Sequence, residues 1–147
     1  MNAYRVFLIG AALLSASVPA SADIVEGRTA NDRPFISGGI GVGEVEQLKQ
    51  IADKYSLQLI VSSTAGAYLA DMHGTIIGAN GQKILDTQLN APWLMVDLVP
   101  GSYTVEVTHQ GGQAQRRNIT IAPGKREQIV IQFNVPADTA KNPAPGR

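Results

Sequence analysis

Apolar and polar residues alternate along the second half of the chain, and a period of two is typical of β-strands. Three runs show this pattern, with inward faces of Tyr103, Val105 and Val107, then Ile119 and Ile121, then Ile129, Ile131 and Phe133. Turn-forming pairs separate the runs: Pro100-Gly101, Gly111-Gly112 and Pro123-Gly124. Turns that recur about every 10 to 12 residues indicate an all-β sandwich.

Further strands are predicted upstream of these runs. Leu57, Leu59 and Val61 form one apolar face. Residues 68–72 and 75–79 are extended candidates, and Asn80-Gly81 predicts a two-residue hairpin into residues 83–88. A strand that opens at Trp93 is expected to turn Leu94, Val96 and Leu98 inward. The sandwich domain, residues 56–135, therefore has seven or eight predicted strands.

Residues 44–55 have a different period. Their apolar residues lie three and four positions apart and form one stripe: Val45, Leu48, Ile51, Ala52 and Tyr55. Glutamates stand near the start of this segment and lysines toward its end, which suits the helix dipole. We expect one amphipathic helix that packs on the sandwich.

The run from Leu98 to Val107, with the later Gly pair, the strand Asn118–Ile121 and the Pro-Gly turn, resembles carboxypeptidase regulatory-like domains. The resemblance covers residues 57–135 and implies a Greek-key sandwich of the prealbumin-like type, usually extracytoplasmic. The expected fold is an all-β, seven- or eight-stranded Greek-key prealbumin-like sandwich preceded by one α-helix. Such domains serve as accessory, folding or binding modules in very different proteins, so the resemblance implies no single function.

The two ends of the chain have their own signatures. Arg5, the apolar run from Val6 to Val18 and Ala20-Ser21-Ala22 match a signal peptide over residues 1–22. A mature chain that starts at Asp23 and is periplasmic or secreted is expected. Residues 136–147 are rich in proline and lack large apolar side chains, so a disordered tail is predicted.

Residues 23–43 are polar or rich in glycine and show no sustained period, which predicts an irregular Gly-rich arm. Phe35 and Ile36 would cost solvation if exposed, so they should dock on a partner or on the domain itself. We expect the partner, because the helix already covers one side of the sandwich. The predicted partner-binding residues are Phe35, Ile36, Gly38, Gly39, Gly41 and Trp93. The segment FISGGIGVGE also resembles the part before the helix in small secreted proteobacterial proteins with this sandwich. The glycines lack the strand and βαβ context of a nucleotide site.

The composition narrows the function classes. Without Arg5, 11 basic side chains face 12 acidic ones, a formal charge of −1 that does not indicate nucleic acid or an anionic membrane as partner. The chain has no cysteine, and His73 and His109 lack neighbours at ligand spacing, so neither a disulfide nor a metal or other cofactor is expected.

Catalytic residues are not predicted. Asp71, Asp86 and Asp97 stand beside turns or on outward positions, and no serine lies in a nucleophile elbow. The hydroxyisourate hydrolases are an enzyme branch of prealbumin-like folds with a C-terminal Tyr-Arg-Gly-Ser, which this chain lacks.

We therefore expect a non-enzymatic, exported interaction module that binds another cell-envelope or extracellular protein through the arm or a sheet edge. The alternative is a carbohydrate or cell-wall ligand-binding module that uses Trp93, the sole tryptophan, as a stacking platform. Burial of Trp93 would oppose this alternative. No membrane span is expected after cleavage of the signal peptide.

Overall fold

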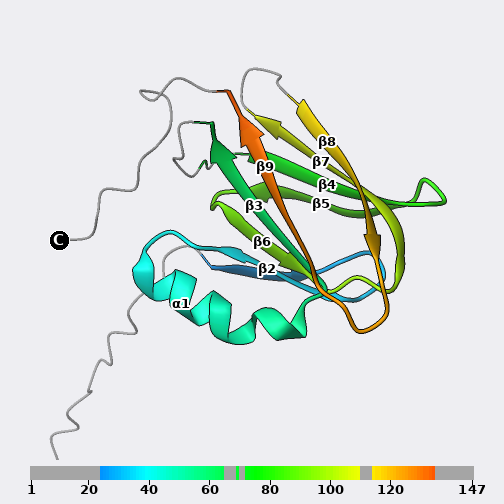
Figure 1. The fold of residues 1–147 in the computed structure, drawn as a ribbon, viewed down its shortest axis with the longest axis horizontal. Coiled ribbons are helices and arrows are strands. Elements are labelled where there is room, and N and C mark those ends of the chain that lie inside the picture. The colour runs from blue at the N-terminus through cyan, green and yellow to red at the C-terminus, as the bar shows by residue number, and fades with distance from the viewer. Residues whose placement is uncertain (1–23, 65–68, 70–71, 110–113, 135–147) are drawn as a thin grey trace, which may run out of the picture.

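The computed structural model describes residues 24–64, 69, 72–109 and 114–134, and it folds them into two facing β-sheets with one short helix (Figure 1). One sheet has five strands in the order β1-β2-β6-β3-β9, and the other has four in the order β5-β4-β7-β8. The strands are β1 Val25–Arg28, β2 Pro34–Gly38, β3 Leu57–Ser63, β4 Met72–Gly78, β5 Lys83–Leu89, β6 Trp93–Val96, β7 Gly101–His109, β8 Ala114–Ile121 and β9 Glu127–Phe133. The helix α1 spans Val42–Ile51 and continues as a 3₁₀ turn, η1, at Ala52–Lys54. The predicted all-β sandwich with one amphipathic helix is confirmed.

The space between the sheets holds the main core. Alternate residues of the strands point into it, as the period of two predicts. From the five-stranded sheet come Leu57, Leu59, Val61, Leu94, Val96, Ile131 and Phe133; from the four-stranded sheet come Met72, Ile76, Leu85, Leu89, Tyr103, Val105, Val107, Ile119 and Ile121. Every inward residue predicted for the strands at 57–61, 93–98, 101–109 and 114–121 is buried here.

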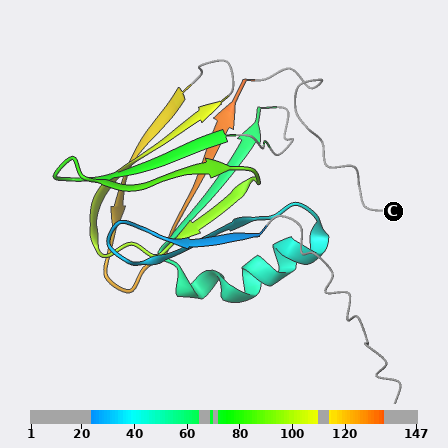
Figure 2. The same ribbon diagram turned by 180° about the vertical axis from the view of Figure 1, so that it is seen from behind.

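A second, smaller core lies on the outer face of the five-stranded sheet, beneath the helix. Ile36, Leu48, Trp93 and Met95 are its buried members, and the predicted helix stripe packs around them. Figure 2 shows the β1–β2 hairpin, in blue, beside this helix. The expectation that the helix packs on the sandwich is confirmed, although the helix begins at Val42 rather than Glu44. The Glu44 carboxylate accepts hydrogen bonds from the amides of Gly39 and Ile40, which ties the helix start to the end of β2.

The prediction of an irregular arm over residues 23–43 is wrong for its described part. Residues 25–28 and 34–38 form a hairpin whose second strand pairs with β6, with Ser37 opposite Leu94. The core between the two sheets covers one face of β2, and the helix covers the other. Phe35 and Ile36 are therefore buried on opposite sides of the strand. A strand buried on both faces does not alternate, and its pattern therefore does not indicate a strand. The region 56–135 holds seven described strands, as predicted, and the hairpin adds two.

The Asn80-Gly81 turn joins β4 to β5, with Gly81 at φ +80° and the Gly78 amide bonded to the Gln82 carbonyl at 2.8 Å. The predicted hairpin is present, but its connection is longer than the two residues expected, because residues 79–82 separate the two strands. The predicted signal peptide at 1–22, the tail at 136–147 and most of the candidate strand at 68–72 lie outside the described residues. No helix in the described part of the chain is long and apolar enough to cross a membrane.

Candidate functional site

The edge strand β9 is the element with the most distinctive exposed surface. It runs parallel to β3, with Leu57 opposite Glu127 and Ser63 opposite Phe133. Ile129, Ile131 and Phe133 point toward the main core. Gln128, Val130 and Gln132 point to the opposite face, and all three are exposed. Val130 has 45% of its surface open to solvent although it is a large aliphatic residue.

The backbone of β9 also has one unpaired side. The Glu127 amide donates to the Ser56 carbonyl, and the Phe133 carbonyl accepts from the Thr64 amide, each at 2.8 Å, so these two residues turn their polar groups toward β3. Because the direction of the N–H and C=O groups alternates along a strand, Gln128, Val130 and Gln132 direct theirs outward. Within the described ranges no strand pairs with that side of β9. Three N–H groups and three C=O groups therefore face outward from this edge.

The other edge strands carry features that discourage pairing. β8 has Arg116 and Arg117 in its middle, and β1 includes Glu26 and Arg28. β5 carries Asp86, and its edge is partly occupied because the Ala30 amide donates to the Ile84 carbonyl at 2.8 Å.

β9 has a single charge, Glu127 at its first position, and then an uncharged run of six residues, QIVIQF, with high strand propensity. An exposed edge of this kind tends to pair with another chain. The uncharged run is visible in the sequence, and it contrasts with the charged residues of the other edge strands, β1, β5 and β8.

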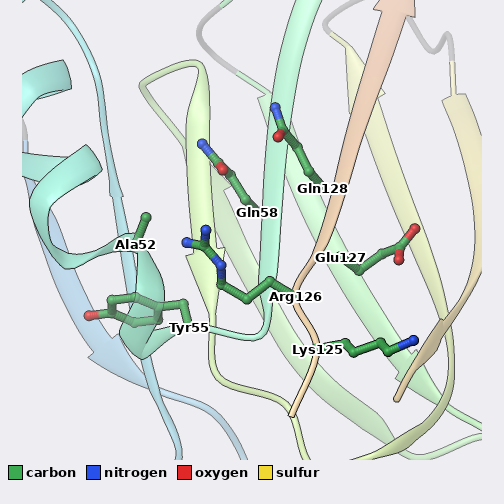
Figure 3. A pocket seen from close by; sticks show the side chains of 7 residues that line it. All are labelled: Ala52, Tyr55, Gln58, Lys125, Arg126, Glu127 and Gln128. Carbon is green, nitrogen blue, oxygen red and sulfur yellow. The ribbon is translucent and has the colours of Figure 1, made fainter. Parts of the chain in front are cut away.

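A hollow of about 370 Å³ adjoins the start of β9 (Figure 3). It is lined by Ala52, Tyr55, Gln58, Lys125, Arg126, Glu127 and Gln128. Figure 3 shows the Arg126 guanidinium group between Ala52 and Gln58, whereas Lys125 and Glu127 extend away from it. Neither Lys125 nor Arg126 forms an ion pair with a described residue.

Tyr55 separates this hollow from a second one that is lined in part by Glu26 and Phe35. Burial raises the pKa of the Tyr55 phenol above its ordinary value, and the carboxylates of Glu26 and Asp97 raise this pKa further. The phenol therefore remains a hydrogen-bond donor well above neutral pH. In the hollow beside β9, the side-chain amides and the guanidinium group can bind the carbonyl or carboxylate oxygens of an incoming segment.

The predicted partner-binding residues are mostly inside the protein. Phe35 is 8% exposed in the main core and Ile36 is 3% exposed under the helix, so they dock on the domain itself and not on a partner. This corrects the expectation that favoured a partner. Trp93 is 7% exposed, and its indole nitrogen has no hydrogen-bond partner among the described residues.

The three glycines of that set have structural roles near the helix start. Gly38 is buried between Ile24 and Leu48, and Gly39 has φ +102° with its Cα against the Trp93 ring. Gly41 has φ +98° and is the exposed N-cap residue of α1. Close packing and positive φ explain all three without a ligand.

The histidines and aspartates that could take part in catalysis or metal binding do not form one site. His73 and Lys83 both contact the carboxylate of Asp86 on the outer face of the four-stranded sheet. Asp97 pairs with Arg33 at 2.8 Å, and the His109 ring packs against Phe133. No cluster of three or more His, Asp or Glu residues suited to a metal occurs in the part of the chain that the structure describes. Asp71 lies outside it.

No family model matches this chain, and a search of curated proteins finds no match either.

Proposed function

We propose that this protein is a non-enzymatic, exported interaction module that binds another protein of the cell envelope by adding a strand to β9. The observation that carries the proposal is the outward edge at Gln128, Val130 and Gln132, which is unpaired among the described residues and has no charge in its interior. A strand laid along it would satisfy the six outward backbone groups and cover Val130. Backbone bonds would supply affinity, and the hollow beside Arg126 would select among segments.

Export is the second part of the proposal and is supported by the signal-peptide pattern at residues 1–22. The absence of cysteine from the whole sequence is compatible with an oxidising compartment but does not require one.

We also propose that the sandwich is a carboxypeptidase regulatory-like domain of the prealbumin-like type. The run VPGSYTVEV carries the resemblance. In it, the Tyr103 hydroxyl donates to the Val99 carbonyl at 2.6 Å, a local corner that links β7 to the preceding turn.

The burial of Trp93 argues against the carbohydrate alternative. A stacking platform has to present its ring face to the sugar, whereas this ring lies beneath the helix and against Gly39. Arg116 and Arg117 on β8 are exposed, and Arg116 pairs with Glu106 across the sheet, so they need no anionic ligand to explain them.

The proposal is tested by a matched pair of variants. Val130→Lys puts a charge on the β9 edge, and Val25→Lys makes the same change at an equally exposed valine on β1, the opposite edge of the same sheet. Protein recovered from cells that express the full chain is immobilised and exposed to envelope extract, and captured proteins are identified by mass spectrometry.

We expect Val130→Lys to weaken capture of the wild-type partner by about tenfold or more, since a charge at the centre of a strand edge opposes pairing. Val25→Lys should capture it normally. Amide exchange at Gln128, Val130 and Gln132 should slow when the partner is added. Equal capture by both variants would contradict strand addition at β9.

A further inference from the structure

The middle of β9 reads the same in both directions. Around Val130 the order is Gln128-Ile129-Val130-Ile131-Gln132, a palindrome centred on the most exposed apolar residue of the strand. A strand of this kind is complementary to itself when a second copy runs antiparallel to it. Two-fold related contacts of the same surface are the commonest form of protein dimer.

The outward backbone groups have the matching pattern. With a two-fold axis at Val130, each Val130 faces its counterpart, and each Gln128 faces the Gln132 of the other copy. All three facing pairs use residues whose N–H and C=O groups point outward, so each pair exchanges two hydrogen bonds. The two exposed valines cover one another, the glutamine amides meet side by side, and Ile129 lies opposite Ile131 on the core side.

The charges at the edge favour this antiparallel arrangement over a parallel one. Lys125, Arg126 and Glu127 lie together at the start of β9, and no charge follows them up to Asn134. Antiparallel pairing places the two charged ends far apart, with Arg126 opposite the neutral amide of Asn134. Parallel pairing would set the cations of the two copies against each other, which destabilises a strand pair.

We propose that β9 pairs with β9 of a second copy of this chain about a two-fold axis at Val130, so that the five-stranded sheets of the two copies become continuous. The inference rests on the proposed function, because both use β9 as the edge at which chains associate. It adds that a second copy of this chain covers the edge before a partner binds. Self-pairing keeps the uncharged strand covered, and a partner segment binds by exchanging with the second copy.

Cysteine cross-linking tests the register, because the natural chain contains no cysteine. Val130→Cys lies on the axis and should form a disulfide between identical chains, since facing residues in a hydrogen-bonded pair are about 5.5 Å apart at Cα. Gln128→Cys alone and Gln132→Cys alone should not, because identical positions would be about 14 Å apart along the strand. A mixture of these two variants should cross-link. Thermal unfolding of each variant verifies that it is folded.

Light scattering of the uncross-linked protein provides the second measurement. The wild type and Val25→Lys should show a dimer mass that dissociates on dilution, and Val130→Lys should be monomeric. A monomeric wild type at every concentration would overturn the inference, and so would cross-linking of Gln128→Cys alone as efficient as that of Val130→Cys. If the wild type is monomeric and Val130→Lys still loses capture, the dimer fails and the proposed function stands. If the wild type forms the dimer and Val130→Lys captures the partner normally, the proposed function fails and the dimer stands.

Discussion

The hydroxyl of Ser56 makes two hydrogen bonds to one residue, Leu98: it donates to the Leu98 carbonyl at 2.9 Å and accepts from the Leu98 amide at 2.7 Å. The Ser56 carbonyl also accepts from the Glu127 amide at 2.8 Å. Ser56 stands between the helical segment and β3, so this residue joins the entry to β3, the exit of β6 and the start of β9. These three strands are neighbours in the sheet.

We predict that Ser56→Ala lowers the free energy of unfolding by about 1 to 3 kcal/mol, because it removes the hydroxyl that bonds both the amide and the carbonyl of the buried Leu98. Urea unfolding followed by circular dichroism provides the measurement. Ser102→Ala, at an exposed strand position, is the control and should change the value by about 0.5 kcal/mol or less. Similar losses for both variants would mean that the hydroxyl of Ser56 has no special role.

Ile131 and Gln132 are adjacent on β9 but face opposite sides of the sheet. Ile131 is 1% exposed and Gln132 is exposed. We predict that Ile131→Ala costs about 2 to 5 kcal/mol, since it opens a cavity in the main core, and that Gln132→Ala is nearly neutral. Denaturant unfolding at low protein concentration measures both without a contribution from self-association. If Gln132→Ala were the more damaging change, the register of β9 would be shifted by one residue.

Gly39 and Gly43 offer a comparison of two glycines near the helix start. A Cβ at Gly39 would lie 3.0 Å from Cδ1 of Trp93 at a φ of +102°, whereas one at Gly43 would meet nothing within 4 Å. Gly39→Ala should therefore destabilise by about 1 to 3 kcal/mol, and Gly43→Ala should stabilise by about 0.5 to 1 kcal/mol because alanine favours the helix. Thermal midpoints decide the signs. Trp93 fluorescence should shift to the red in Gly39→Ala only.

Tyr103 predicts a loss of stability at alkaline pH. Burial raises the pKa of its phenol above the ordinary value of 10.0, and Arg33 partly opposes this change. A raised pKa in the folded state means that the stabilisation is complete below the unfolded value and is lost as the pH rises through the folded value. Wild-type stability should therefore fall above pH 10, measured by urea unfolding across the alkaline range.

Tyr103→Phe removes the titrating group and the hydrogen bond to Val99. It should be less stable than the wild type at neutral pH by about 1 kcal/mol, but it should lose less stability above pH 10. Tyr55 also has a raised pKa, so Tyr55→Phe is a companion variant that retains the Tyr103 contribution. An identical alkaline slope for the wild type and Tyr103→Phe would contradict this assignment.

The signal-peptide pattern predicts processing after Ala22. Mass spectrometry of the exported protein should find Asp23 at the N-terminus. Recovery of a soluble species that begins at Met1 or Asn2 would contradict the prediction.

The sandwich could be predicted from the sequence because its strands are buried on one face and therefore alternate. Leu57, Leu59 and Val61 gave the correct inward face of β3 from their spacing alone. The hairpin at residues 25–38 could not be predicted from the sequence, because Phe35 and Ile36 are consecutive and both are buried, which breaks the alternation. The sequence predicts the helix, but that it lies over Ile36 is seen only in the tertiary structure.

The candidate site at β9 could likewise be predicted only in part. Its uncharged run after Glu127 is visible in the sequence. That β9 is an edge strand depends on its pairing with β3, a contact between distant segments that no local pattern specifies. The glycines around the helix start have the composition of a binding loop, but they are required by positive φ and close packing, which only the structure shows.

The parallel pairing of β3 with β9 has a consequence for how the chain folds. Leu57 pairs with Glu127, so the two paired residues lie 70 positions apart in the sequence. While the chain is being made from its N-terminus, β3 lacks this neighbour until the final described strand has emerged, and loop closure over that distance slows folding. The five-stranded sheet therefore cannot be completed until nearly all of the chain is present. A product truncated before Glu127 would leave one edge of β3 without a partner strand and would remove Ile131 and Phe133 from the main core, which favours aggregation.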